Sequence, residues 1–355
     1  MIKVLVVEDS PVVREFLVYI LNSDPDVTVI ATAGDGEEAL DVLRSHRPDV
    51  ITMDIHMPKL NGLEATRVIM ETQPTPIVIV SGSTDPTEVV TTFDAIDAGA
   101  LAVLRRPAGI GNPDHEATAR DLIQVVKLMS EVKVVRRWSR MRKSFQTPCQ
   151  TSISSLPRAA QREIVVLGAS TGGPPALETI LRALPKDFPA PILIVQHMAG
   201  GFIEGFVEWL KNSASLPVHV AKQGELPLPG HVYVAPDEYQ MKVGSDARIV
   251  LTNDEPEHGL MPSISYLFRS VADVYGHSAI AGLLTGMGRD GAEELYMLKE
   301  KGSITFAQDK DSSVVHGMAG EAIKLDAATL ILPLQKIAAV LTDLVNDKGE
   351  MKFGS

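Results

Sequence analysis

Short apolar runs alternate with segments of helical periodicity along most of the chain. In the first third, β-branched and apolar runs occupy residues 3–7, 27–31, 50–53, 77–80 and 101–104, with helical patterns between them. Runs of this kind are typical of parallel strands that are covered on both faces by helices. The alternation therefore predicts an α/β domain with a doubly wound parallel sheet, whose last helix runs from residue 114 to about 128.

A polar segment without periodicity, QTPCQTSISSLPRAAQ, interrupts this pattern and is typical of a linker. Alternation resumes at Arg162, and the expected strands are 164–167, 192–195, 218–221, 231–235, 249–251, 279–284, 303–307 and 330–332. We therefore expect two doubly wound α/β domains, residues 1–125 and 162–347. A helical or flexible linker, 126–161, joins them, and a tail, 348–355, follows.

The chain has 355 residues, which is enough for two hydrophobic cores, and its formal net charge is −12. This charge argues against nucleic acid or an anionic membrane as the main partner. A single cysteine, Cys149, excludes an internal disulfide and a cysteine metal cage. The first residues favour a strand over a secretion signal, and no apolar run reaches membrane-spanning length. We expect a cytoplasmic protein without membrane insertion, and a solvated basic helix face at residues 136–143.

Acidic side chains follow two strands of the first predicted sheet. Glu8 and Asp9 come directly after the first strand, and Asp54 follows the third. The carboxyl ends of parallel strands meet at one edge of a sheet, so we expect these carboxylates to lie together. They repel one another unless a cation is present, and their oxygens suit Mg²⁺. Ser81 and Arg106 end two later strands, where both could contact a phosphoryl group.

Residues 1 to about 125 resemble a response-regulator receiver domain, which has a flavodoxin-like fold. The matching residues are Glu8, Asp9, Asp54, Met57-Pro58, Asn61-Gly62 and Ser81. The resemblance implies that Asp54 accepts a phosphoryl group from a chemotaxis histidine kinase, with Mg²⁺ held by Glu8, Asp9 and Asp54.

Two positions depart from the receiver pattern. Arg106 stands where that family has a lysine, and Val103 stands where it has a switching tyrosine or phenylalanine. A guanidinium is a planar fork and an ammonium is a compact point charge, so the exchange is not neutral. We expect Arg106 to pair with Asp54, with phosphotransfer retained and coupling to the second domain altered or weakened.

In the second domain, a serine among glycines follows the first strand, in IVVLGASTGGPP. Such glycines permit a sharp turn that exposes the Ser170 hydroxyl, and the next helix offers N–H groups to an oxyanion. A glycine-rich dinucleotide loop has the same local pattern, so this segment alone leaves both sites open. A dinucleotide site also predicts an acid after the next strand, where the chain has Gln196-His197.

A serine nucleophile needs a base and a group that orients the base. His197 follows the next strand and Asp290 follows a later one, so both are expected at the same sheet edge as Ser170. The order Ser170, Asp290, His316 is instead that of the α/β-hydrolases. Position along the chain leaves both triads open.

Residues 162 to about 347 resemble the Rossmann-like catalytic domain of bacterial chemotaxis protein-glutamate methylesterases. The resemblance implies that Ser170 is the nucleophile, His197 the base and Asp290 its orienter. It also implies an oxyanion site at the backbone near Met287, with Thr171 beside it. The matching motifs are Gly168-Ala169-Ser170-Thr171-Gly172-Gly173-Pro174, Val195-Gln196-His197-Met198, Thr285-Gly286-Met287-Gly288, Asp290-Gly291, Ala307-Gln308-Asp309, Ser313 and Gly317-Met318.

One segment departs from the methylesterase pattern. That family has an arginine before the Pro-Ser pair and an acid two residues after it, whereas this chain has Met261 and Ser265. We expect the loss of an ion pair near the domain surface or the substrate groove. This loss would leave the triad untouched and change the preference for substrate.

The two resemblances together imply a phosphorylation-regulated hydrolase of chemosensory adaptation. It would remove methyl groups from glutamate γ-methyl esters on the cytoplasmic helices of chemoreceptors, and would deamidate receptor glutamines through the same acyl-enzyme. The resemblance implies that Mg²⁺ serves the receiver alone and that the ester chemistry needs no cofactor. Two alternatives are a receptor-binding signalling adaptor with weak or no catalysis, and a dinucleotide-binding protein.

Overall fold

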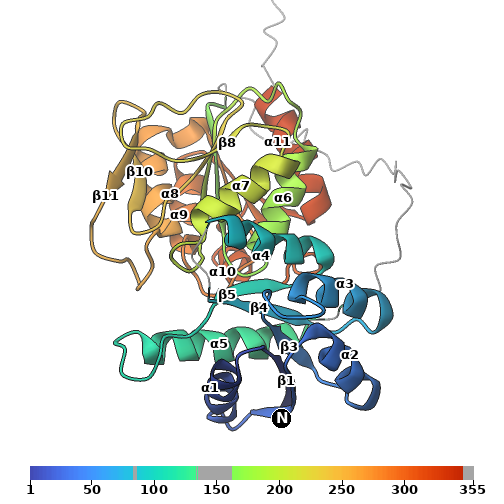
Figure 1. Ribbon diagram of the computed structural model, residues 1–355. Helices are drawn as coiled ribbons and strands as arrows, with labels where there is room; N and C mark the ends of the chain where they lie inside the picture. Colours follow the sequence, from blue (N-terminus) through green and yellow to red (C-terminus); the bar gives the residue numbers. More distant parts are fainter. Residues whose placement is uncertain (83–85, 133, 135–161, 347–355) are drawn as a thin grey trace, which may run out of the picture.

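The computed structural model describes residues 1–82, 86–132, 134 and 162–346, which form two α/β domains stacked on each other (Figure 1). Most of the predicted linker, the basic stretch at 136–143 and the predicted tail lie outside the described residues. In the described parts of the chain, no helix combines the length and the apolar content that crossing a bilayer requires.

The first domain is a five-stranded parallel sheet in the order β2-β1-β3-β4-β5. Side chains alternate between the faces of each strand, so Val4 and Val6 of β1 pack with α1 and α5, while Leu5 and Val7 pack with α2, α3 and α4. The elements are β1 (Ile2–Val7), α1 (Pro11–Asn22), β2 (Val27–Ala33), α2 (Gly36–Ser45), β3 (Val50–Met53), α3 (Gly62–Thr72), β4 (Ile77–Ser81), α4 (Pro86–Ala98), β5 (Ala102–Arg105) and α5 (His115–Ser130).

The second domain is a seven-stranded parallel sheet in the order β14-β13-β12-β6-β7-β9-β8. Buried side chains of α6, α7 and α11 pack on one face, and those of α8, α9 and α10 pack on the other. The elements are β6 (Ile164–Ala169), α6 (Gly173–Ala183), β7 (Ile192–Gln196), α7 (Ile203–Ser213), β8 (Val218–Val220), β9 (Val232–Val234), β10 (Gln240–Val243), β11 (Ile249–Thr252), α8 (Ile264–Val274), η2 (Gly276–Ser278), β12 (Ala279–Leu283), α9 (Ala292–Glu300), β13 (Ile304–Gln308), α10 (Met318–Lys324), β14 (Leu330–Leu332) and α11 (Leu334–Asn346).

Two features differ from the sequence-based expectation. The expected strand at 249–251 is not part of the parallel sheet: it is β11, which pairs antiparallel with β10, a strand that the apolar pattern did not predict. The four residues of β10 are too few to show a periodicity. The expected domain boundary at residue 125 also falls inside α5, which continues to Ser130, because Val126 and Met129 are buried in the core of the first domain.

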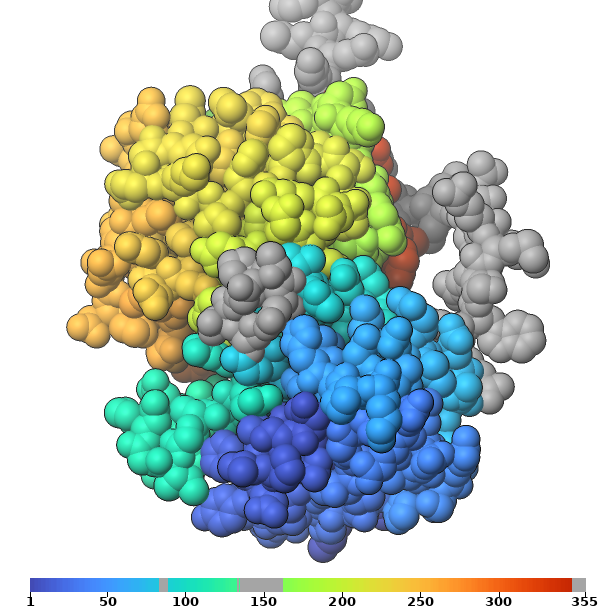
Figure 2. All heavy atoms as spheres, viewed as in Figure 1, coloured from blue at the N-terminus to red at the C-terminus, as the bar shows by residue number. Residues whose placement is uncertain are grey.

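Helix α4 of the first domain packs against α7 of the second (Figure 1). The ring of Phe93 on α4 lies 5.4 Å from that of Phe206 and 5.7 Å from that of Trp209, measured between centroids. The Trp209 indole N–H donates to Asp97 Oδ2 at 3.1 Å. The two domains therefore meet along an aromatic contact, and the space-filling view shows them touching along this seam (Figure 2).

Candidate functional site

The site begins at the turn that follows β6. Gly172 has a φ of 77°, a conformation that glycine adopts without strain, and it starts α6 directly after Ser170 and Thr171. A Cβ at Gly172 would lie 2.5 Å from Val314, so the turn also has no room for a side chain. The Gly173 N–H donates to the Ser170 carbonyl at 2.7 Å. This tight turn leaves the Ser170 side chain in the cleft between the domains.

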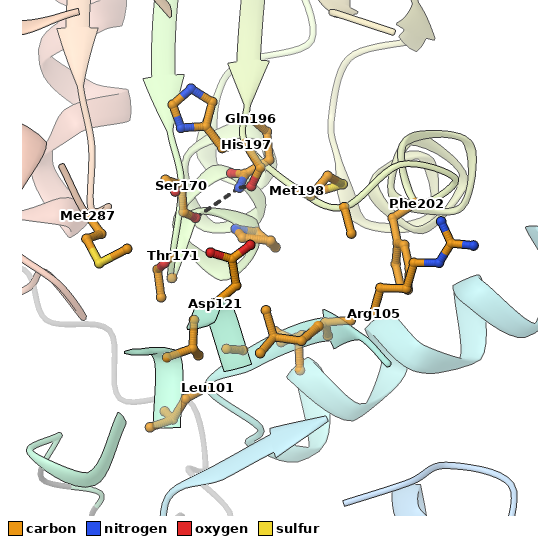
Figure 3. A pocket seen from close by; sticks show the side chains of 18 of the residues that line it. Leu101, Arg105, Asp121, Ser170, Thr171, Gln196, His197, Met198, Phe202 and Met287 are labelled. Carbon is orange, nitrogen blue, oxygen red and sulfur yellow. Dashed lines mark hydrogen bonds between the residues drawn. The ribbon is translucent and has the colours of Figure 1, made fainter. Parts of the chain in front are cut away.

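Neighbouring strands bring His197 to the same edge. Ala169 at the end of β6 pairs with Gln196 at the end of β7, and the His197 N–H donates to the Ala169 carbonyl at 2.9 Å. Ser170 and His197 therefore follow paired residues, and both line one cleft of about 280 Å³ (Figure 3). The structure brings these two side chains to one place, although they are far apart in the sequence.

Gln196 contacts the backbone of both residues. Its Nε2 donates to the Ser170 carbonyl at 2.9 Å, drawn as a dashed line in Figure 3, and to the His197 carbonyl at 2.8 Å. The side chain is 2 % exposed, so it fixes the two turns from inside the domain. This role of Gln196 was not predicted from the sequence, although a polar residue at the end of an otherwise apolar strand is a usable signal.

Asp290 follows β12, which pairs with β6, and its Oδ2 lies 2.9 Å from His197 Nε2. Burial alone would raise the pKa of Asp290. The hydrogen bonds from His197 and from the Ile264 N–H outweigh burial and hold the pKa well below its usual range. The ionised carboxylate accepts the Nε2 proton, so the imidazole offers its other nitrogen, Nδ1, as a base. The three residues follow β6, β7 and β12, at the switch point of the sheet.

His316, the alternative base, has different neighbours. Its Nδ1 lies 3.4 Å from Ser313 Oγ, and its backbone bridges to Gly286. The bond to Asp290 is made by His197. The geometry therefore favours the triad Ser170, His197, Asp290 over the α/β-hydrolase order.

The segment that departs from the family pattern lies against the triad. Ser263, Ile264 and Ser265 all donate to the carboxylate of Asp290. These bonds come from the Ser263 hydroxyl and from two backbone N–H groups, so they do not require a particular side chain at the changed positions, Met261 and Ser265. The expectation that the changes leave the triad untouched stays a prediction. The start of α8 folds over Asp290 because a buried carboxylate needs several hydrogen-bond donors. Ser265, where the family has an acid, donates to Glu294 at 2.6 Å instead.

The first domain forms the other wall of the cleft. Met287 and Thr171 line it from the catalytic side. On the side of the first domain it is lined by Leu101, which precedes β5, by Arg105 of β5 and by Asp121 of α5 (Figure 3). Val103 of β5, at the family's aromatic position, is also in this wall. The first domain therefore borders the same cleft as Ser170 and His197.

The three acids of the first domain lie together at the carboxyl edge of the five-stranded sheet, as predicted. Ligand oxygens of Glu8, Asp9 and Asp54 are within 4.8 Å of one another. Burial, together with the charge of Asp54, raises the pKa of Glu8 to about 7, and burial also raises the pKa of Asp54. A Cβ at Gly62 would lie 1.9 Å from the Asp54 carbonyl, which explains the glycine after Asn61. The donor set and its excess negative charge fit a hard divalent cation such as Mg²⁺.

Arg106 is in this group, but its nearest acid is not the expected one. Its Nη2 lies 3.1 Å from Glu8 Oε2 and 3.8 Å from Asp54 Oδ1. The guanidinium reaches the more deeply buried Glu8, whose charge has the greater need of a partner. Its backbone N–H donates to the carbonyl of Ser81, which ends β4. Arg106 thus borders the acidic group, and the backbone of Ser81 is bonded to that of Arg106.

Comparison with known proteins agrees with the assignment of both domains. Residues 165–341 match the CheB methylesterase family, and residues 4–112 match the response regulator receiver domain. A protein-glutamate methylesterase/protein-glutamine glutaminase of Nitrosospira multiformis is 78 % identical over 355 residues, which is all of both chains. A protein of the same name from Geobacter metallireducens is 53 % identical over 98 % of this chain and 100 % of its own.

The solved structures include the catalytic domain of the Thermotoga maritima CheB methylesterase. It is 36 % identical, has a TM-score of 0.51, and covers 52 % of this chain and 100 % of its own. Together with the two family matches, these likenesses support the hydrolase reading over a dinucleotide-binding protein or a non-catalytic adaptor. The chain belongs to the CheB methylesterase family, and it carries a response regulator receiver domain ahead of its catalytic domain.

Proposed function

We propose that this chain is a protein-glutamate methylesterase that also deamidates glutamine. It hydrolyses glutamate γ-methyl esters on the cytoplasmic helices of chemoreceptors, in sensory adaptation. The observation that carries the proposal is the bond between His197 and Asp290 beside Ser170, in a cleft of a domain whose relatives have this name. The proposed substrate and the proposed kinase partner are both cytoplasmic, which supports a cytoplasmic location.

The proposed catalytic steps use three side chains, those of Ser170, His197 and Asp290. The Ser170 oxygen attacks the γ-carbonyl carbon of the ester while His197 takes the hydroxyl proton. The tetrahedral intermediate then expels methanol, which receives that proton from His197. Water, deprotonated by the same imidazole, hydrolyses the acyl-serine and releases the glutamate carboxylate. A glutamine side chain passes through the same acyl-enzyme and loses ammonia instead of methanol.

The oxyanion needs donors at the same edge. Thr171 and Met287 both line the cleft beside Ser170. We assign the stabilisation of the negative charge to the backbone at these two positions, since N–H donors that are fixed in place favour an oxyanion.

The receiver domain regulates access to this site. We assign Asp54 as the phosphoacceptor and a chemotaxis histidine kinase as the phosphodonor. Glu8, Asp9 and Asp54 would hold Mg²⁺, which supplies positive charge for the phosphoryl group when it is bound. Because the receiver forms one wall of the cleft, phosphorylation would act by loosening the contact between α4 and α7.

Release of methanol from a methyl-labelled receptor tests the function. Wild-type protein should release labelled methanol, and Ser170→Ala should release none above the background of the receptor alone. Ser313→Ala is the matched control, since this serine hydroxyl donates to the Asp309 carbonyl and lies outside the proposed triad. Equal release by wild type and Ser170→Ala would refute the proposal and favour an adaptor.

A further inference from the structure

Ser263 is a buried serine whose hydroxyl does not serve its own helix. It is the residue before α8, where a serine usually accepts a hydrogen bond from the first turn, yet it makes no such cap. Its hydroxyl instead donates to Asp290 Oδ1 at 2.9 Å, and the residue is fully buried.

Asp290, which is not part of α8, caps the N-terminus of this helix. Its Oδ2 accepts the Ile264 N–H at 2.6 Å, and its Oδ1 accepts the Ser265 N–H at 3.1 Å. With Ser263 on Oδ1 and His197 on Oδ2, each oxygen has two donors. Four donors on two oxygens fix the plane of the carboxylate and therefore the direction from which His197 is held.

A second buried side chain holds Ser263 in place. Gln240, the first residue of β10, accepts the Ser263 N–H with Oε1 at 2.8 Å and donates from Nε2 to the Leu260 carbonyl at 3.0 Å. Gln240 is fully buried. One donor and one acceptor face it, so the orientation of its amide is determined by its partners. A continuous set of hydrogen bonds thus runs from the ribbon β10–β11 through Ser263 to Asp290.

We propose that Ser263 is a positioning residue of the esterase, and that Gln240 anchors it to the ribbon β10–β11. The inference rests on the proposed function, because it concerns the orientation of the catalytic base. The ribbon β10–β11 lies outside the main sheet. Through Gln240 this ribbon supports the start of α8 beside the Asp290 carboxylate, and it therefore contributes indirectly to catalysis. The titratable and charged groups of a second pocket beside Asp290 are His258, Arg289, Glu293 and Glu294, and those that line the interdomain cleft with His197 are Arg105 and Asp121.

The test compares two serine-to-alanine variants on the same helix. Ser263→Ala removes a donor from Asp290. Ser270→Ala is the matched control: its hydroxyl accepts the Val243 N–H of β10 at 3.0 Å and donates to Leu267, so it also joins α8 to the ribbon. A merely structural role predicts similar effects from both changes.

We expect Ser263→Ala to lower kcat about tenfold, with KM little changed. The Asp290 carboxylate, with one donor fewer, carries more negative charge towards His197 and favours the imidazolium. The acid limb of the kcat/KM profile should therefore move to higher pH by about half a unit. Ser270→Ala should keep the wild-type pH profile and kcat.

Two further variants keep the test decisive if Ser263→Ala folds poorly. Ser263→Cys has similar volume and only a weak donor, so it should shift the acid limb in the same direction. Ser263→Thr retains the hydroxyl and should restore the wild-type limb. If wild type is active and Ser170→Ala is inactive, but the pH profiles of Ser263→Ala and Ser263→Cys superimpose on that of wild type, the positioning role is overturned and the proposed function stands. An inactive wild type would instead contradict the proposed function.

Discussion

Two buried carboxylates of this protein have pKa values that are shifted in opposite directions. Asp290 has four donors around its two oxygens, and its pKa lies well below the usual range despite burial. Glu8 lies beside Asp54 with Arg106 as a cation, and its pKa is raised to about 7 by burial and by the neighbouring charge. The number of donors facing each oxygen decides whether a buried acid keeps its charge.

The raised pKa of Glu8 predicts a pH-dependent stability. Its pKa of about 7 exceeds the model-compound value of 4.5, so the folded state binds more protons than the unfolded state between these values. The free energy of unfolding should fall as pH rises through this window, by roughly 3 kcal/mol at most from this group. Glu8→Gln should flatten the dependence, measured from thermal unfolding of the receiver with EDTA present. Glu71→Gln, at an exposed position on α3, should leave it unchanged.

The two candidate bases are separable by single substitutions. His197→Ala removes the group bonded to Asp290 and should lower the rate of methanol release by at least about 100-fold. His316→Ala removes a side chain that bonds Ser313 and should leave most of the activity. The measurement is the initial rate with methylated receptor. Near-normal turnover of the His197 variant would end the proposed triad.

At the scale of elements, the contact between α4 and α7 depends on close approach. Gly205 on α7 lies under Val89 of α4, and a Cβ at Gly205 would be 2.4 Å from Val89 Cγ1. The aromatic rings of Phe93, Phe206 and Trp209 fill the space beside it. A small residue on one helix therefore permits the other helix to hold the receiver over the cleft.

Gly205→Ala should separate the two helices and open the cleft. We expect the rate without phosphodonor to rise several-fold, because the added methyl group cannot fit unless α4 moves away. The rate of methanol release at fixed substrate concentration measures this effect. Gly109→Ala is the control, since a Cβ there meets nothing within 4 Å. A rate that stays at the wild-type value would show that α4 does not limit access.

At the scale of the whole molecule, one protein contains two sites at the carboxyl edges of two sheets. The receiver presents β5, α4 and α5 to the catalytic domain, and Asp54 lies at the edge of the same receiver sheet. Val103 lies in the shared wall, and Arg106 bonds Glu8. The receiver therefore combines an acidic group at its sheet edge with a contact surface that departs from the family pattern.

Phosphorylation should activate this protein only modestly. A valine has no hydroxyl or ring that could move between two positions, and Arg106 is held by Glu8. Acetyl phosphate with Mg²⁺ should phosphorylate Asp54, which is measured as an increase in the mass of the wild-type protein that is absent from Asp54→Asn. The same treatment should raise the rate of methanol release only a few-fold. An increase of many-fold would contradict weak coupling between the domains.

Much of the fold could be predicted from local patterns. Parallel strands buried on both faces are continuous apolar runs, so most strands of both sheets were predicted within two residues of their observed ends. Strand β10 was not predicted, since four residues, QMKV, carry too little periodicity. The polar residues that follow strands β1, β3, β6 and β7 predicted the location of both sites, because parallel topology brings the carboxyl ends of strands together at one edge.

The sequence by itself determined the alternation of strands and helices, the acids after β1 and β3, and the serine turn, because these depend on neighbouring residues. Only the tertiary structure decided which histidine meets Asp290, which acid holds Arg106, and that the start of α8 surrounds the orienting carboxylate. These contacts join residues from 26 to 98 positions apart. Their partners are selected by packing and by the hydrogen-bonding needs of buried charge, which no local pattern records.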